Sequence, residues 1–410
     1  MINSCCLCGN QTFREVFELG TLPLGFPIEP SKALANQVWR QKLELVICKR
    51  CYLVQTVHKI PKEELVSENL YSSSSSKLVS DHDEQFSSNI PSLLSLSKDS
   101  LILEIGCGDG SLLEKFYQKG FSNLIGIEPS AHSEKGYPFE VITDFLNADV
   151  VRVLSNRGKY PDCIIAKHVI DLVPDLDLLF SNLANLMKNG AFVIIEVPYL
   201  IDFLNAFRID GFAHLECCWF TINSLIYALD KYNMGIVSIE HETNYRGGTL
   251  RVIAKKGYQK EISNLILDWK NKEVEELSPR SFNAFRDKID RLRRDIRSKI
   301  AELTEEKKIP IYGYGGGLKA STLVNWLNLT SKEIKMVVDI DHNKHYKMIP
   351  IANIPIKPVP SLFNLAQNAK IAVIILALDH VNEVEAILSK RLGKGSLIIH
   401  PLPEFKTIVI

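Results

Sequence analysis

The chain has 410 residues, of which 46% are hydrophobic and 23% are charged, a composition typical of globular proteins with more than one domain. Its 48 basic residues balance its 48 acidic residues, which argues against a dedicated nucleic-acid-binding protein, because such proteins normally carry a basic excess. No run of about 18 apolar residues is present and the N-terminus lacks a signal-like pattern, so we expect a cytoplasmic protein without a membrane partner.

Four cysteines near the N-terminus form two Cys-x-x-Cys pairs, Cys5 with Cys8 and Cys48 with Cys51. Both thiolates of such a pair can bind one tetrahedral Zn²⁺, and two pairs complete a four-sulfur site. Four protein ligands leave no open position, so the expected zinc is structural. The alternative is a set of free thiols. Residues 1–66 are predicted to be a small zinc-binding module with short strands.

Residues 67–262 begin with a polar stretch, Asn69–Ser76, whose composition is typical of a flexible linker. Helix-length segments then alternate with apolar segments, which predicts a mostly parallel, doubly wound α/β sheet. The predicted buried strands are Leu101–Ile105, Asn123–Ile127, Cys163–Ala166 and Ala191–Val197.

Residues 263–410 begin with apolar residues spaced three and four apart between Phe282 and Leu303. This spacing predicts one long amphipathic helix whose apolar stripe faces a core. The apolar segments Ile309–Tyr312, Met336–Ile340 and Ile371–Ala377 follow, and they predict strands of a second, Rossmann-like α/β unit.

A glycine-rich turn follows the first strand of the central unit, with Gly106, Gly108 and Gly110 after the acidic Glu104. Such a turn lets the backbone approach a ligand closely and aims helix N–H groups at it. Glu128 ends the next strand about 20 residues on, where it can accept hydrogen bonds from both ribose hydroxyls. The turn alone would suit a dinucleotide or S-adenosylmethionine (SAM), and the position of Glu104 with the glycine spacing favours SAM. We expect Asp144 and Phe145 to meet the adenine.

In this order of motifs the chain resembles the sugar C-methyltransferases of deoxysugar pathways, which act on nucleotide-linked 4-keto-6-deoxyhexoses. These enzymes have an N-terminal zinc module, a central SAM domain and a C-terminal Rossmann-like domain. The resemblance covers nearly all of the chain and rests on the cysteine pairs, Leu53–Gln55, the Tyr71 and serine-rich segment with His82, Glu104–Gly110, Glu196–Tyr199, Arg246–Arg251, Gly313–Thr322 and Val338–Ile340.

The resemblance places the catalytic base in a tetrad that usually reads Tyr-His-Glu-His. Here the segment before Trp219 reads Ala213-His214-Leu215-Glu216, so only an imidazole and a carboxylate remain. C-methylation needs a base, because a carbon acid must become an enolate before it can attack the methyl sulfonium. If this stretch is extended, its period of two puts His214 and Glu216 on one face as an acid/base pair. The alternative is an ordinary polar pair at a strand edge.

The resemblance also implies that the serine-rich segment is a lid over the site, with Tyr71 as a catalytic candidate that donates to the enolate oxygen. His168 ends a strand on the ligand side and is expected to border the sulfonium of SAM, although it could equally be a solvated loop residue. The C-terminal glycine turn is expected to hold the nucleotide diphosphate of the sugar, with Lys319 as counter-charge. The predicted substrate-binding residues are Ser73, Ser76, Tyr199, Arg246, Gly247, Gly248, Gly315 and Lys319.

Together these patterns predict a SAM-dependent methyltransferase with a structural zinc, acting as a monomer or weak dimer on C3 of a nucleotide-linked 4-keto-deoxysugar. Two alternatives remain open. The altered tetrad is compatible with an oxygen or nitrogen acceptor on a nucleotide sugar, which needs a weaker base. A binding protein that does not methylate is the other alternative, and the intact glycine turn with Glu128 argues against it.

Overall fold

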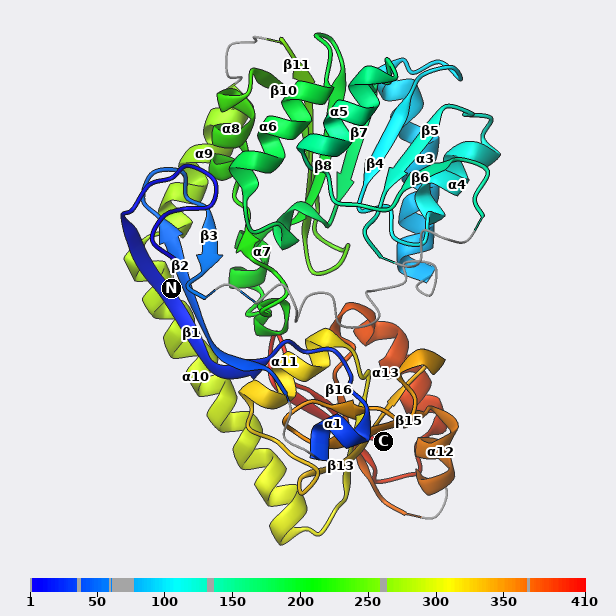
Figure 1. Cartoon of the computed structure of the whole chain (residues 1–410). Coiled ribbons are helices and arrows are strands. Elements are labelled where there is room, and N and C mark those ends of the chain that lie inside the picture. Colours follow the sequence, from blue (N-terminus) through cyan, green and yellow to red (C-terminus); the bar gives the residue numbers. More distant parts are fainter. Residues whose placement is uncertain are drawn as a thin grey trace.

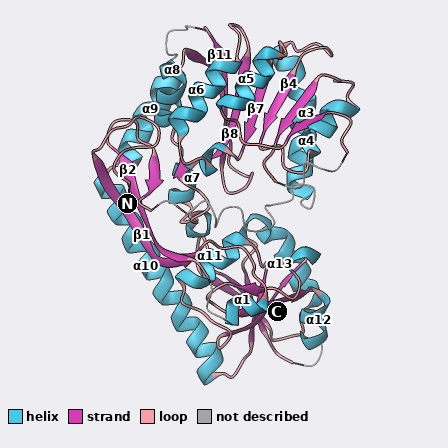
Figure 2. Ribbon diagram, in the orientation of Figure 1, coloured by secondary structure: helices cyan, strands magenta, loops and turns pink. Residues whose placement is uncertain are grey.

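The computed structural model describes residues 2–34, 38–58, 60, 77–130, 136–258, 264–366 and 369–410. These residues form three sheets and their helices (Figures 1 and 2). The predicted lid residues Tyr71, Ser73 and Ser76 lie outside the described residues. No helix within the described ranges is long and apolar enough to cross a membrane.

The central sheet has seven strands in the order β10-β11-β8-β7-β4-β5-β6. The strands from β6 to β8 are parallel, whereas β11 is antiparallel to both β8 and β10. Every residue of β4 and β5 is buried, as expected for parallel strands covered on both faces. The strands are β4 (Ile102–Ile105), β5 (Leu124–Ile127), β6 (Glu140–Ile142), β7 (Cys163–Lys167), β8 (Phe192–Pro198), β10 (Met234–Glu242) and β11 (Thr249–Lys256).

The helices of this region are α3 (Lys77–Leu94), α4 (Ser111–Gln118), α5 (Ala148–Asn156), α6 (Leu176–Leu186), α7 (Leu200–Asn205), α8 (Ile222–Lys231) and α9 (Asn264–Glu276), with short 3-10 turns η3 (Ile170–Leu172) and η4 (Ile209–Gly211). Helix α4 follows β4 directly, so the glycine turn between them lies at the carboxyl edge of the parallel strands.

The C-terminal sheet repeats this arrangement with the order β14-β15-β13-β12-β16-β17-β18. Counting only the parallel strands, in both sheets the first lies in the middle, the second and third lie on one side of it, and the fourth and fifth lie on the other. The elements are β12 (Ile311–Tyr314), β13 (Ile334–Asp339), β14 (Met348–Ile349), β15 (Ile354–Pro358), β16 (Ala372–Ile375), β17 (Leu397–His400), β18 (Lys406–Val409), α11 (Leu318–Trp326), α12 (Pro360–Ala366), α13 (Val381–Arg391), η6 (His342–Lys344) and η7 (Leu378–His380). The predicted fold class, with two Rossmann-like units, is confirmed.

The N-terminal sheet has the order β1-β2-β3-β9 and is antiparallel throughout. Its strands are β1 (Phe13–Pro23), β2 (Arg40–Cys48), β3 (Val54–Thr56) and β9 (Cys218–Trp219), and the short helix α1 (Pro30–Leu34) lies between β1 and β2. Because β9 comes from the central part of the chain, the predicted tetrad just before it lies where the N-terminal and central regions meet.

Helix α10 (Pro279–Ala301) is the predicted long amphipathic helix, and a short π-helical turn, η5 (Glu302–Glu306), extends it. Ser278 caps its start by accepting the N–H of Ser281 at 3.2 Å, which is a favoured N-terminal signal. The predicted stripe is buried, and the ring of Phe285 lies 4.9 Å from that of Phe17 on β1. The helix runs alongside the β1–β2 ribbon and ties it to the C-terminal domain (Figure 1).

Candidate active site

The glycine turn of the central domain has three residues with left-handed φ angles: 67° at Gly106, 54° at Gly108 and 77° at Gly110. L-residues with a side chain rarely adopt this conformation. A Cβ on Gly106 would come within 2.5 Å of the Val169 side chain, whereas a Cβ on Gly108 would meet nothing within 4 Å. The backbone at Gly108 therefore borders open space, as a close-approach site for a ligand requires.

Glu128 closes over this turn from the end of β5. One of its carboxylate oxygens accepts the N–H of Gly108 and the other accepts the N–H of Ser130, both at 2.9 Å. Its side chain is nearly buried, yet each oxygen retains acceptor capacity. The geometry thus places a carboxylate against the glycine turn, and its contact with a ribose stays a prediction.

Glu104 lies at the end of β4 with one carboxylate oxygen buried and without a hydrogen-bond partner among the described residues. Burial, together with the negative charges of Asp109 and Glu128, raises the pKa of Glu104 well above its ordinary value. A group left without a partner in this way is costly. It is the type of feature that a bound cofactor would resolve.

Phe145 and Asp144 follow β6 at the same edge of the sheet. The Phe145 side chain is 66% exposed, which is unusual for a large aromatic ring and leaves its face available for stacking. Asp144 accepts the N–H of Phe145 at 2.7 Å and so orders the turn. Their contact with adenine stays a prediction.

His168 follows β7 with a left-handed φ of 49°, and its N–H donates to the Glu196 carbonyl at 2.8 Å. Burial lowers the pKa of His168 well below its ordinary value, and the nearby Arg246 lowers it further. Its Nε2 is buried and has no partner among the residues that the structure describes. His168 as a whole is half-buried, so its position beside the sulfonium stays a prediction, and so does the alternative of a solvated loop histidine.

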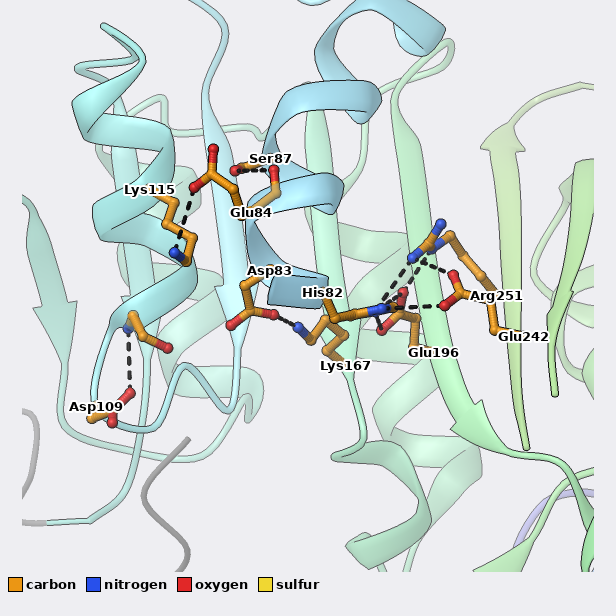
Figure 3. A network of polar contacts seen from close by, with 11 residues as sticks. His82, Asp83, Glu84, Ser87, Asp109, Lys115, Lys167, Glu196, Glu242 and Arg251 are labelled. Atoms are coloured by element: carbon orange, nitrogen blue, oxygen red, sulfur yellow. Dashed lines mark hydrogen bonds and ion pairs between the residues drawn. The ribbon is translucent and has the colours of Figure 1, made fainter. Parts of the chain in front are cut away.

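Figure 3 shows a buried polar network that we did not predict. It lies near His168, whose ring centroid is 5.7 Å from that of Tyr245. His82 on α3 contacts both carboxylate oxygens of Glu196 at 3.0 Å, and Arg251 donates to Glu196 at 2.6 Å. Burial alone would raise the pKa of Glu196, but the hydrogen bond with His82 and the neighbouring cations hold it below its ordinary value. Tyr245 stacks on His82 with ring centroids 3.7 Å apart.

The sequence did contain a signal for this network. Glu196 stands inside the otherwise apolar strand β8, and Arg251 stands between apolar neighbours in β11. A charge at such a position needs a partner. The sequence could not say that the partner would be His82, which lies on a distant helix. The network holds the N-terminal half of α3 against the sheet.

The β10–β11 turn meets the C-terminal domain at a second charged cluster. Lys319 on α11 pairs with Asp379 at 2.6 Å and donates to the Arg246 carbonyl at 3.3 Å. Arg208 pairs with Asp379 at 2.7 Å and with Asp210 at 2.8 Å. Lys319 thus shares Asp379 with Arg208, and its predicted role as the counter-charge of a diphosphate stays a prediction.

Gly247 and Gly248 in that turn have φ angles of 91° and 115°. A Cβ on Gly248 would lie 2.1 Å from the Asp202 carboxylate, and one on Gly247 would lie 2.9 Å from Arg208. Close packing against Asp202 and Arg208 thus explains why glycine stands at both positions. Their contact with a substrate stays a prediction. Tyr199 is buried, and its ring packs against His241 and against Trp269 of α9, so the structure places it in the packing against α9.

The C-terminal glycine turn reproduces the geometry of the central one. Asp339 ends the second strand of its sheet, and its two carboxylate oxygens accept the N–H groups of Gly316 at 2.7 Å and Asp341 at 2.8 Å. Gly315 has a φ of 100°, and a Cβ there would lie 2.7 Å from Ala377. Asp339 thus holds the position in this turn that Glu128 holds in the central one.

The predicted pairing of His214 with Glu216 is wrong. His214 lies in a turn rather than a strand, and its Nε2 lies 2.8 Å from the Gln41 carbonyl beside the β1–β2 ribbon. Burial lowers the pKa of His214 to about 4. Glu216 instead lies near Asp171, Lys319 and Arg246, and burial with the charge of Asp171 raises its pKa to about 8.

The four predicted metal-ligating thiols do come together. The sulfurs of Cys5 and Cys51 are 3.6 Å apart, those of Cys8 and Cys48 are 3.5 Å apart, and all four lie within 4.8 Å of one another. A tetrahedral zinc with bonds of about 2.3 Å requires sulfurs about 3.8 Å apart. The donor set therefore fits zinc, and Cys6 is not part of it.

Comparisons with known proteins agree with this architecture. Residues 79–239 match a family model described as a methyltransferase domain, and residues 244–403 match a C-methyltransferase C-terminal domain. The chain is 23% identical to the C-methyltransferase NovU of Streptomyces niveus over 99% of its own length and 97% of that protein. These matches bear out the resemblance expected from the sequence.

Solved methyltransferases are similar to part of this chain. A SAM-dependent methyltransferase from Methanosarcina mazei is 17% identical, with a TM-score of 0.32 over 42% of this chain and 98% of that chain. The magnesium protoporphyrin IX methyltransferase of Synechocystis PCC 6803, solved with bound SAH, is 14% identical, with a TM-score of 0.34 over 48% of this chain and 92% of that chain.

Proposed function

We propose that this chain, a SAM-dependent methyltransferase related to the deoxysugar C-methyltransferases, methylates C3 of a nucleotide-linked 4-keto-6-deoxyhexose. The observation that carries the proposal is the match to a C-methyltransferase over 99% of the chain. The substrate class comes from the sequence motifs, and two glycine turns with facing carboxylates support it, because two nucleotide-containing molecules must bind together.

The central domain would hold SAM, which supplies an electrophilic methyl group. Glu128 would accept hydrogen bonds from the ribose hydroxyls, and the open space beside Gly108 would admit the cofactor to the backbone. Phe145 would stack on the adenine, and the neutral His168 would border the sulfonium without adding positive charge. Positioning of the methyl group is then the main contribution of these residues.

The C-terminal domain would hold the nucleotide part of the sugar substrate. Gly315 and the start of α11 would face the diphosphate with backbone N–H groups, and Asp339 would meet the ribose as Glu128 does in the central domain. Arg246 in the β10–β11 turn would lie between the two ligands. Lys319 would act mainly through its ion pair with Asp379.

Glu216 is the better candidate for the base than His214. A carboxylate whose pKa is raised to about 8 is a stronger base than an ordinary one, and enolate formation needs that strength. His214 has a lowered pKa and its Nε2 is engaged by Gln41, which fits a structural role. Tyr71 would donate to the enolate oxygen.

The cluster of Cys5, Cys8, Cys48 and Cys51 would hold a structural zinc. The four sulfurs would fill all its positions, so the metal would stabilise the N-terminal module and would not take part in methyl transfer.

Incubation with SAM and a panel of nucleotide-linked sugars, read by mass spectrometry, tests the proposal. We expect a gain of one methyl group only with 4-keto sugars, and exchange of the C3 proton for solvent deuterium when SAM is left out. Methylation without any C3 exchange would contradict carbon as the acceptor. It would instead support an oxygen or nitrogen acceptor, which the missing tetrad residues at Ala213 and Leu215 also favour.

A further inference from the structure

The loop after β7 lies between the cofactor turn and the altered tetrad. Val169 in this loop fills the space over Gly106, where a Cβ would meet its side chain at 2.5 Å. Two residues further on, the carbonyl of Asp171 accepts the N–H of Cys217 at 2.8 Å. The same segments meet again where the Cys217 thiol lies 3.4 Å from the Leu172 carbonyl. The loop therefore connects the glycine turn to the segment that carries Glu216.

Each of the two joined segments carries a carboxyl oxygen that lacks a hydrogen bond to any described residue. Oδ1 of Asp171 and Oε2 of Glu216 are both buried, and neither has a hydrogen-bond partner among the residues that the structure describes. Asp171 as a whole is only 4% exposed. Burial of a carboxyl oxygen without a partner costs free energy, and the contacts among the described residues do not compensate either of these two oxygens.

We propose that Asp171 is a positioning residue for Glu216, and that its buried negative charge makes Glu216 basic enough to remove the proton from the substrate carbon. This inference rests on the proposed function, and it assigns a role to a residue that lies outside the tetrad.

The charges around the pair give the order in which it titrates. Burial raises the pKa of Asp171 to about 6, with Arg246 opposing the shift. Burial and the charge of Asp171 together raise the pKa of Glu216 to about 8, while Lys319 and Arg246 oppose the shift. The buried thiols of Cys217 and Cys218 follow Glu216 in the chain. As the pH rises, Asp171 therefore ionises first, and Glu216 becomes an available base only near pH 8.

The step itself is a simple proton transfer followed by methyl transfer. The Glu216 carboxylate takes the C3 proton, and the C–H electron pair forms the enolate with the C4 carbonyl. The enolate carbon then attacks the methyl group of SAM, and the C–S electron pair remains on the sulfur of S-adenosylhomocysteine. Glu216 returns its proton to solvent afterwards, and Asp171 stays ionised throughout.

The first experiment measures the titration of Glu216 directly, without any substrate. Carbon-13 NMR of protein labelled at the glutamate side-chain carboxyl would identify Glu216 as the signal lost in Glu216→Gln. We expect a midpoint near pH 8, which moves to lower pH in Asp171→Asn because the repulsion is removed. Asp171→Glu should restore the high midpoint, since it restores the charge. Asp177→Asn, a surface change that removes a pair with Lys231, is the matched control and should change nothing.

The second experiment measures deuterium exchange at C3 of a thymidine-diphosphate-linked 4-keto-6-deoxyglucose against pH, without SAM. We expect the midpoint of exchange to follow the midpoint of Glu216 in wild type and in both Asp171 variants. A Glu216 midpoint that is unmoved in a folded Asp171→Asn protein overturns the role of Asp171. An exchange profile that stays fixed while the Glu216 midpoint moves overturns Glu216 as the base. Absence of exchange in wild type contradicts the proposed function, and the NMR titration still decides whether Asp171 tunes Glu216.

Discussion

Two glycines of the same turn differ in what surrounds them, although the sequence presents them alike. Both have left-handed φ angles, 67° at Gly106 and 54° at Gly108. Gly106 is closed in by Val169, whereas Gly108 faces open space. Gly106 thus serves the packing of the loop after β7, and Gly108 serves the approach of the cofactor.

We therefore expect Gly106→Ala and Gly108→Ala to separate stability from binding. Each costs about 1–2 kcal/mol for the left-handed backbone, and Gly106→Ala adds a clash with Val169. Thermal unfolding should show the larger loss for Gly106→Ala, and calorimetric titration should show weakened SAM binding by a folded Gly108→Ala. Normal SAM affinity in Gly108→Ala would contradict the proposal that SAM occupies the space beside Gly108.

The two surviving residues of the tetrad should also respond differently. Glu216→Gln is expected to lower turnover by about 10²–10⁴, the usual range for loss of a general base, with SAM affinity unchanged. His214→Ala removes a buried contact with the Gln41 carbonyl and is expected to cost about 1–3 kcal/mol of stability, with turnover close to wild type. Steady-state kinetics and chemical denaturation would test both predictions. A large loss of turnover in His214→Ala with nearly normal turnover in Glu216→Gln would identify His214 as the base.

At the scale of elements, the N-terminal sheet depends on strands from two parts of the chain. Its two cysteine pairs flank β1 and β2, and β9 completes the sheet from the central region. A metal in the cluster of Cys5, Cys8, Cys48 and Cys51 would fix the ends of β1 and β2 and, through them, the segment that carries Glu216.

Removal of the metal should therefore lower stability, because binding energy at a structural zinc site is folding energy. We expect about one Zn²⁺ per chain by elemental analysis, lost in Cys48→Ser together with a lower melting temperature. Cys6→Ser is the matched control, since Cys6 lies outside the cluster. An unchanged melting temperature after chelation would show that the module folds without metal.

At the scale of the whole molecule, ion pairs connect the central and C-terminal domains. Asp379 accepts from Arg208 of the central region and from Lys319 of α11. Burial would raise the pKa of Asp379, but the two cations hold it below its ordinary value. The stabilisation that ionised Asp379 provides is fully present above the pKa that this carboxyl group has in the unfolded chain. It is lost as the pH falls through the lower pKa of Asp379 in the folded protein.

Asp379→Asn should loosen the docking of the C-terminal domain. We expect a loss of about 1.5–3 kcal/mol at neutral pH, the usual cost of a lost hydrogen bond to a charged group, and a smaller difference from wild type in acid. Denaturation at several pH values and limited proteolysis would measure it. Glu383→Gln on the neighbouring α13, where the side chain is 74% exposed, is the control. Equal stability of Asp379→Asn and wild type at neutral pH would contradict this role.

The sequence by itself determined the features that depend on neighbouring residues. The cysteine pairs, the glycine turns, the buried strands and the stripe of α10 are local patterns, and their geometry follows from backbone and side-chain periodicity. The repeated strand–turn–helix order also determined the fold class, because parallel strands with helical crossovers assemble in few ways.

Only the tertiary structure decided which polar groups meet. His214 and Glu216 are two residues apart, but the turn between them separates their side chains. His214 contacts the Gln41 carbonyl, whereas Glu216 is under the influence of the Asp171 charge. Likewise, Glu196 of β8 binds His82 of α3, and Lys319 forms an ion pair with Asp379 instead of being free in solvent. The physical reason is that burial and charge at a site are set by segments far apart in the chain, and a local pattern carries no record of them.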